Sequence, residues 1–327
     1  MLVSNAARSG LTSISGADIA AARERIAGVA LRTPLIRLSA DNGVGEVYLK
    51  LENLQPIGSF KLRGAANAMA LAGNEALSHG VYTASAGNMA QGVAWCARDI
   101  GVRCRVVVPD TAPKTKTDAI ERLGGEVFKV PFDEWWQTLI SRSHPDMNGI
   151  FIHPFADAGV MAGNGTIAAE IFEDLENVDA IIVPYGGGGL ACGIASAARA
   201  ISPKTEVYAV EVETAAPLRA SFLAGAPTTV ARTPTFIDGM GSGAVFDEMW
   251  PLVESLLSGT IVVTVAQIAE AIKILVERCR VVAEGAGAAA FAAARTGALN
   301  GKRTVCIVSG GNIDPNVLST ILRGDIP

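Results

Sequence analysis

A lysine stands where a helix is predicted to begin, in residues 59–64 (Ser-Phe-Lys-Leu-Arg-Gly). The segment follows an alternating apolar strand near residues 47–52 and a turn built around Pro56 and Gly58. The positive end of the helix dipole and burial both disfavour an ammonium group, so we expect a lowered pKa for Lys61. A neutral amine is the form that attacks a carbonyl to make a Schiff base. Taken alone, Lys61 would be interpreted as a solvated lysine beside a turn, and only the motifs downstream favour the Schiff base.

A run of four glycines, Gly186, Gly187, Gly188 and Gly189, follows a buried-strand pattern at 179–184 and precedes a helix pattern. Backbone N–H groups of such a loop can approach a phosphate closely, and the helix N-terminus adds partial positive charge. A tight turn alone needs only one or two glycines. The run matches neither the Gly-x-Gly-x-x-Gly nor the Walker fingerprint, so neither a dinucleotide nor a Walker-type nucleoside triphosphate is favoured.

Two further loops of small residues follow predicted strands. Residues 85–89 (Ser-Ala-Gly-Asn-Met) come after a strand at 81–84, and residues 309–312 (Ser-Gly-Gly-Asn) come after a strand at 304–308. Open α/β sheets place their ligands at the carboxyl ends of parallel strands. These loops are therefore predicted to meet the lysine and glycine loops at one site.

The order of the four motifs resembles that of the fold-type II pyridoxal-phosphate enzymes, in the serine/threonine dehydratase (threonine ammonia-lyase) branch that also contains serine racemase. The resemblance covers nearly the whole chain. It implies an α/β fold of two doubly wound domains, similar to the β subunit of tryptophan synthase. The large cofactor-binding domain would comprise residues 1–78 and 156–327, and the small mobile substrate domain residues 79–155. The cofactor would lie in the cleft between them.

The resemblance also implies roles for individual residues. Lys61 would hold pyridoxal phosphate as a Schiff base and act as the base at the substrate Cα. Phe60 would pack beside the ring, and Gly239 would face it from the other side. Asn88 would bind the phenolic oxygen and Ser309 the pyridine nitrogen. The cofactor phosphate would be held by the glycine loop, Gly186, Gly187, Gly188 and Gly189. The substrate carboxylate would be held by the substrate loop, Ser85, Ala86, Gly87, Asn88 and Met89.

Two residues of the substrate loop depart from the family pattern, which usually reads Ser-Ser-Gly-Asn-His. Ala86 replaces the serine that serves racemases as the opposite-face acid and base, so two-base racemisation is disfavoured. Met89 replaces the histidine and makes a more apolar pocket floor, which allows a bulkier 3-hydroxy amino acid. A hydroxyl at the pyridine nitrogen, from Ser309, makes a weaker electron sink than a carboxylate and favours β-elimination.

The leading hypothesis is β-elimination of water from a 3-hydroxy amino acid such as L-threonine or L-serine, giving a 2-oxo acid and ammonia. Racemisation or β-replacement on the same scaffold remains an alternative, as does a cofactor-binding protein without turnover. A nicotinamide dehydrogenase would need a fingerprint that is missing here.

The sequence leaves open whether the protein binds a divalent cation. Relatives bind one through a glutamate, a backbone carbonyl and a further acid, and Glu211 and Ala215 match the first two positions. Pro217 stands where the acid is expected, and Glu213 is the only evident substitute. Hard cations need several oxygen ligands, so this site is incomplete by sequence.

Composition narrows the class of protein. Half of the 327 residues are apolar, enough for a sizeable core, and the net charge of -5 gives no electrostatic case for nucleic acid or an anionic membrane. We find no signal-peptide core and no apolar run of ~18 residues. We therefore expect a cytoplasmic enzyme with a small-molecule amino-acid substrate, and the family favours a homodimer.

Five scattered cysteines indicate neither a disulfide framework nor a zinc site: Cys96, Cys104, Cys192, Cys279 and Cys306.

The remaining elements are predicted from periodicity. A capping box at 15–18 begins the first helix, residues 133–149 form a peripheral helix with its loop, and residues 227–243 form a long irregular loop near the active site. Further strands, with helices between most of them, are expected near residues 104–108, 126–130, 150–152, 205–212 and 260–263.

Overall fold

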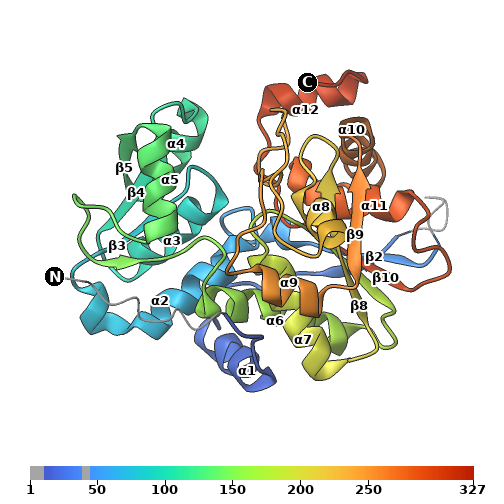
Figure 1. The fold of residues 1–327 in the computed structure, drawn as a ribbon, viewed down its shortest axis with the longest axis horizontal. Helices are drawn as coiled ribbons and strands as arrows, with labels where there is room; N and C mark the ends of the chain where they lie inside the picture. The colour runs from blue at the N-terminus through green and yellow to red at the C-terminus, as the bar shows by residue number, and fades with distance from the viewer. Residues whose placement is uncertain (1–10, 39–44) are drawn as a thin grey trace.

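A computed structural model of the chain describes residues 11–38 and 45–327, which form two sheets with helices packed on both faces (Figure 1). The larger sheet has the order β1-β2-β10-β7-β8-β9, with only β1 antiparallel to its neighbour. Its strands are β1 (Leu35–Arg37), β2 (Val47–Lys50), β7 (Ala180–Pro184), β8 (Glu206–Val212), β9 (Gly259–Val263) and β10 (Thr304–Ile307).

The smaller sheet is parallel throughout and has the order β5-β4-β3-β6. Its strands are β3 (Val81–Ala84), β4 (Cys104–Pro109), β5 (Gly125–Val130) and β6 (Ile150–Phe151). We call this sheet with its helices the small lobe and the remainder the large lobe; Figure 1 shows the small lobe at the left.

Strand residues of the large lobe alternate between two hydrophobic clusters, which places helices on both faces of the sheet. Ile181 and Val183 of β7 pack with helices α1, α6, α7 and α9, whereas Ile182 packs with α10 and α11. Period-two alternation with both faces apolar is what a parallel sheet buried by helices requires. These helices are α1 (Gly16–Arg25), α6 (Ala158–Asp174), α7 (Gly189–Ile201), α9 (Trp250–Leu256), α10 (Val265–Ile274) and α11 (Gly285–Arg295).

The small lobe repeats this arrangement. Val106 and Val108 of β4 pack with α2, α3 and α4, whereas Val107 packs with Leu139 of α5. The helices concerned are α2 (Lys61–Leu77), α3 (Asn88–Asp99), α4 (Lys114–Arg122) and α5 (Phe132–Ser141). Two further helices, α8 (Pro217–Ala224) and α12 (Pro315–Arg323), and two short turns, η2 (Glu52–Leu54) and η3 (Leu275–Cys279), complete the described elements.

The α/β fold and all nine predicted strands are confirmed, as is the capping box, in which Ser15 and Asp18 satisfy each other's backbone N–H groups. The antiparallel strand β1 was not predicted. Residues 227–243 contain no helix or strand, as expected. The domain boundaries at 78/79 and 155/156 stay a prediction, although all four strands of the smaller sheet fall between them.

Among the described residues, no helix is both long and apolar enough to span a membrane.

Candidate active site

Lys61 is the first residue of α2. Its Nζ donates a hydrogen bond to the backbone carbonyl oxygen of Pro154 at 2.6 Å. Burial lowers the pKa of Lys61 to about 8, against the opposing charge of Glu284. The amine is therefore far easier to deprotonate near neutral pH than an ordinary lysine, as the sequence predicted from its place at a helix start.

The lysine loop and the loop at 309–312 are joined through their backbones. The N–H of Phe60 donates to the carbonyl of Ser309 at 3.0 Å, and the N–H of Gly311 donates to the carbonyl of Gly58 at 2.9 Å. Gly58 has φ +73°, and a Cβ placed on it would lie 2.6 Å from Oδ1 of Asn312. Only glycine suits this position, since it allows both the left-handed backbone and the close approach.

Asn88 joins the small lobe to two residues of the large lobe. Its Nδ2 donates to Oε1 of Glu284 at 2.8 Å, and its Oδ1 accepts from Nδ2 of Asn312 at 2.8 Å. Nδ2 of Asn312 also donates to the carbonyl of Ile57 at 2.9 Å. Three segments distant in sequence are thus tied together beside Lys61.

Glu284 was not singled out from the sequence. It lies just before α11, has 8% of its surface exposed, and its own N–H donates to the carbonyl of Gly310 at 3.0 Å. Burial, followed by repulsion from Asp238, raises the pKa of Glu284 to about 7; the hydrogen bond from Asn88 and the charges of Lys116 and Lys61 act the other way. The sequence did offer one signal for this site: a lone glutamate stands between the apolar run 281–283 and the Gly-Ala start of a helix.

The four glycines form the turn between β7 and α7, with Gly188 at φ +90°. A Cβ on Gly187 would lie 2.2 Å from the ring of Phe155, and one on Gly189 would lie 2.5 Å from the carbonyl oxygen of Phe155. Side chains are therefore excluded from this loop, which leaves its backbone at the head of a helix as an anion cradle.

Gly239 lies between the glycine loop and the buried glutamate. A Cβ on Gly186 would lie 3.5 Å from the carbonyl oxygen of Gly239, and a Cβ on Gly239 would lie 3.5 Å from Oε1 of Glu284. The irregular segment 227–243 thus reaches the site, as predicted.

The substrate loop divides into two parts. Ser85, Ala86, Gly87 and Asn88 are partly exposed, at the end of β3 and the start of α3. Met89 is 1% exposed and belongs to the hydrophobic cluster of the small lobe. Asn88 is tied to the site by its hydrogen bonds, and contact of a substrate with any of these five residues stays a prediction.

Aromatic rings extend from α5 to the glycine loop. Trp136 and Phe246 have ring centroids 5.6 Å apart, Phe246 and Phe155 4.7 Å, and Phe155 and His153 4.5 Å. Burial and the charges of Arg142 and Lys61 lower the pKa of His153 to about 3. His153 is therefore neutral, and its Nδ1 accepts the backbone N–H of Ala156 at 2.8 Å, which makes it a fixed part of this wall.

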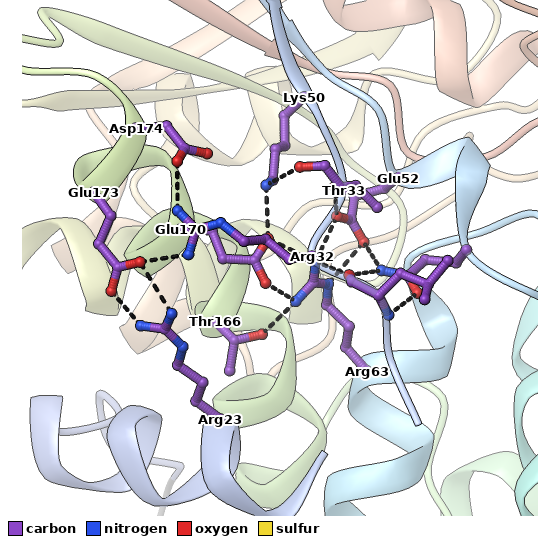
Figure 2. A network of polar contacts seen from close by, with 12 residues as sticks. Arg23, Arg32, Thr33, Lys50, Glu52, Arg63, Thr166, Glu170, Glu173 and Asp174 are labelled. Carbon is purple, nitrogen blue, oxygen red and sulfur yellow. Dashed lines mark hydrogen bonds and ion pairs between the residues drawn. The ribbon is translucent and has the colours of Figure 1, made fainter. Parts of the chain in front are cut away.

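A buried ionic cluster holds the first turn of α2 against β2 and α6 (Figure 2). Arg63 donates to Glu52 through Nε at 2.8 Å and to Glu170 through Nη1 at 2.7 Å. Lys50 donates to Glu170 at 2.6 Å and to the carbonyl of Thr33 at 2.7 Å. Two cations and two anions are thus paired, and α2 is fixed two residues beyond Lys61.

Glu211 does not present a free carboxylate for a cation. Its Oε1 accepts the N–H of Leu218 at 2.7 Å, and its Oε2 accepts the N–H of Arg219 at 2.8 Å and the hydroxyl of Thr260 at 3.1 Å. Both oxygens are thus engaged at the first turn of α8, which begins two residues after Ala215. The described parts of the chain contain no group of three or more His, Cys, Asp or Glu residues able to hold a metal ion.

A lysine amine of lowered pKa, a glycine loop suited to an anion and a polar amide converge between two doubly wound lobes. This combination fits an enzyme that uses a phosphorylated carbonyl cofactor. The chain belongs to the pyridoxal-phosphate-dependent enzymes: the family model described as "Pyridoxal-phosphate dependent enzyme" matches residues 26–310. Its cofactor is pyridoxal phosphate, as the sequence predicted.

The similar proteins lie in the predicted branch of this family. L-Threonine ammonia-lyase of Thermotoga maritima is 39% identical over 311 residues, which cover 94% of this chain and 77% of that protein. Serine racemase of Dictyostelium discoideum superposes with a TM-score of 0.83 at 35% identity, covering 93% and 100% of the two chains. Processed threonine deaminase isoform 2 of Solanum lycopersicum superposes with a TM-score of 0.86 at 32% identity, covering 99% and 93%.

Proposed function

We propose that the protein is a pyridoxal-phosphate-dependent ammonia-lyase that removes water from a 3-hydroxy amino acid such as L-threonine or L-serine. The products are a 2-oxo acid and ammonia. The observation that carries the proposal is Lys61, whose amine has a pKa of about 8 at the head of α2, beside a substrate loop with alanine at position 86. The similarity to a threonine ammonia-lyase and a threonine deaminase supports the same reaction.

The residues of the site fit the cofactor. Lys61 would bind its aldehyde carbon, and the backbone of Gly186–Gly189 would hold its phosphate in the cradle from which side chains are excluded. Asn88 would donate to the phenolic oxygen and Ser309 would face the pyridine nitrogen. Phe60 would pack beside the ring, with Gly239 on the other face.

When bound, pyridoxal phosphate withdraws electrons from the substrate Cα and so acidifies its proton. Ser85, Ala86, Gly87 and Asn88 would hold the substrate carboxylate at the start of α3. Once displaced from the aldehyde carbon by the substrate amine, the amine of Lys61 would remove the Cα proton and, as an ammonium, would deliver a proton to the departing β-hydroxyl. Loss of water leaves an unsaturated amine, and its hydrolysis takes up water again to give the 2-oxo acid and ammonia.

A panel of L- and D-3-hydroxy amino acids tests this proposal, with 2-oxo acid release from the purified holoenzyme as the readout. We expect turnover of at least one L substrate, and the panel extends to bulkier side chains because the substrate range stays a prediction. Cofactor binding with no 2-oxo acid from any member of the panel would favour a binding protein instead.

Racemisation is the second candidate function, because the serine racemase of Dictyostelium discoideum is among the similar structures. Ala86 has no proton to move, so one of the two bases of that route is missing. A general acid–base group contributes ~10²- to 10⁴-fold to a rate. We expect racemisation of L-serine to be slower than pyruvate formation by about that factor. Chiral chromatography of the remaining serine measures it, and equal rates would refute this role of Ala86.

The matched variant is Ala86→Ser, which restores the hydroxyl at this partly exposed position. It is expected to raise racemisation relative to elimination, with little change in stability. Ala72→Ser serves as the control, since that residue is also partly buried but lies on α2 away from the substrate loop. An unchanged ratio in Ala86→Ser would show that the opposite face lacks more than a hydroxyl.

The resemblance to the family also implies a homodimer and a cation bound at Glu211 and Ala215, and both remain proposals. The cation would have to displace hydrogen bonds from both oxygens of Glu211.

A further inference from the structure

Glu284 is a buried carboxyl that none of the four sequence motifs contains. It hydrogen-bonds to Asn88, packs against Gly239 and Gly310, and interacts electrostatically with Lys61. We propose that Glu284 is a positioning residue of the cofactor site, which fixes the amide of Asn88 with its nitrogen available to the bound cofactor. This inference rests on the proposed function, in which Asn88 binds the phenolic oxygen.

The argument begins with the direction of the hydrogen bonds. The carbonyl of Ile57 can only accept, so Asn312 must point its Nδ2 toward it. The same Nδ2 gives its second hydrogen to Oδ1 of Asn88 at 2.8 Å. An amide nitrogen has two hydrogens, so both donors of Asn312 are now used.

Glu284 lies at the other end of this chain of hydrogen bonds. An ionised carboxylate is also acceptor-only, so Asn88 must turn Nδ2 toward Oε1 of Glu284, as observed at 2.8 Å. Asn88 has then used its oxygen and one N–H. The second N–H is the group left for a cofactor oxygen. When Glu284 is ionised, the hydrogen-bond chain is held between two obligate acceptors and allows one orientation of Asn88; with its pKa at about 7, the ionised form prevails above neutral pH.

The fixed orientation depends on the charge of Glu284. A protonated carboxyl, or an amide in its place, both donates and accepts. It could donate to Oδ1 of a flipped Asn88, so that only the hydrogen bond from Asn312 would still oppose the flip. A flipped Asn88 would present oxygen rather than N–H to the electron-rich phenolic oxygen. Two acceptors facing each other lose the hydrogen bond, so the flip weakens cofactor binding.

Every charged group that faces Glu284 bears on this ionisation. Asp238, on the irregular loop, opposes it, whereas Lys116 of α4 and Lys61 of α2 favour it. Asp238 and Lys116 also pair with each other across the two lobes. Glu284 in turn raises the pKa of Lys61, so its charge is felt at the nucleophile as well as at Asn88.

Glu284→Gln tests the proposal, because it removes the charge and keeps the shape. The variant loses a charge-assisted hydrogen bond, which is roughly twice as strong as a neutral one. We expect the dissociation constant of pyridoxal phosphate to rise at least about tenfold, with an altered absorbance of the bound cofactor. Glu75→Gln, an exposed position near the end of α2, is the control and should bind like the wild type.

A second readout uses the protein without cofactor. Because the negative charge of Glu284 raises the pKa of Lys61, its removal should shift the pH profile of Lys61 acylation in the apoprotein to lower pH. Peptide mapping identifies the labelled lysine. A lost packing contact alone would not move this profile.

Unchanged cofactor affinity or an unchanged Lys61 profile in folded Glu284→Gln would overturn the proposal. Should this variant not fold, Asn312→Ala replaces it: Asn312 is exposed and its loss frees Oδ1 of Asn88. It should also weaken cofactor binding, and wild-type affinity would overturn the proposal. A wild type that fails to bind cofactor at Lys61 would instead refute the proposed function.

Discussion

Replacing Lys61 with alanine is expected to abolish 2-oxo acid formation while leaving the protein folded. The variant loses both the nucleophile that binds the cofactor and the base at Cα, so the rate should fall by on the order of 10⁴-fold or more. Among the described residues, its side-chain amine hydrogen-bonds to the carbonyl of Pro154, and alanine keeps the backbone contacts, so little packing is lost. Steady-state 2-oxo acid release and circular dichroism give the two readouts.

The control is Lys204→Ala, at an exposed position of the large lobe, which should keep wild-type activity. Borohydride reduction of the wild-type holoenzyme followed by peptide mapping should place the pyridoxyl group on Lys61. Lys50 has a fully buried side chain, but its Nζ lies 2.6 Å from Glu170, which holds it as an ion pair. A label on Lys50 or any other lysine would refute the assignment.

The pKa of Lys61 gives a pH-dependent expectation in the apoprotein. Burial lowers it from 10.5 to about 8, so the reactive neutral amine appears as the pH rises through about 8. The rate of acylation at Lys61 should therefore be half-maximal near pH 8. The lysine of a short model peptide, with a pKa of about 10.4, should react in this way only at higher pH. A profile for Lys61 equal to that of the peptide would contradict its lowered pKa.

The parts of the fold and site that could be predicted are those with strong local signals. Apolar runs such as 179–184 can be accommodated only as buried parallel strands, because both faces of the sheet are covered by helices. The glycines at 186–189 and the lysine at 61 were identified because each lies in a loop between a strand and the start of a helix, where backbone N–H groups can bind an anion. The strands then bring these loops together at their carboxyl ends.

The parts that could not be predicted depend on contacts between distant segments. Strand β1 has three residues and follows Pro34, so it exists only through its pairing with β2. In the alternating pattern at 47–52, Lys50 occupies a polar position of the kind that usually faces solvent, yet it is buried and paired with Glu170 of α6. Glu284 becomes a site residue only because α11 begins beside Asn88, 196 residues away in sequence.

Replacing Arg63 with alanine is expected to cost more stability than any other single charge removal in the described cluster. Arg63 is 1% exposed and donates to two carboxylates, Glu52 and Glu170. Burial acts to lower the pKa of Arg63, but the two carboxylates outweigh it and raise the pKa. The guanidinium therefore stays charged. Without it, two buried anions share the single cation Lys50, and breaking such a pair costs about 3–5 kcal/mol.

Urea denaturation of the apoprotein measures this loss, and Arg103→Ala provides the matched control. Arg103 donates to Glu126 with similar geometry, at 2.7 Å, but the two side chains are 65% and 51% exposed. Exposed pairs contribute about 0–1 kcal/mol because water solvates both charges. A loss in Arg63→Ala no greater than in Arg103→Ala would show that the cluster is not tightly coupled.

The double variant Arg63→Ala/Glu52→Gln separates the buried charge from lost packing. If the cost of Arg63→Ala comes mainly from an unpaired anion, neutralising Glu52 should recover part of it, and the two changes will not be additive. Cofactor affinity should follow the same order, because Arg63 holds the turn of α2 that carries Lys61. Strictly additive effects on the free energy of unfolding would mean that Arg63 acts through packing, and that its charge is not energetically coupled to the charge of Glu52.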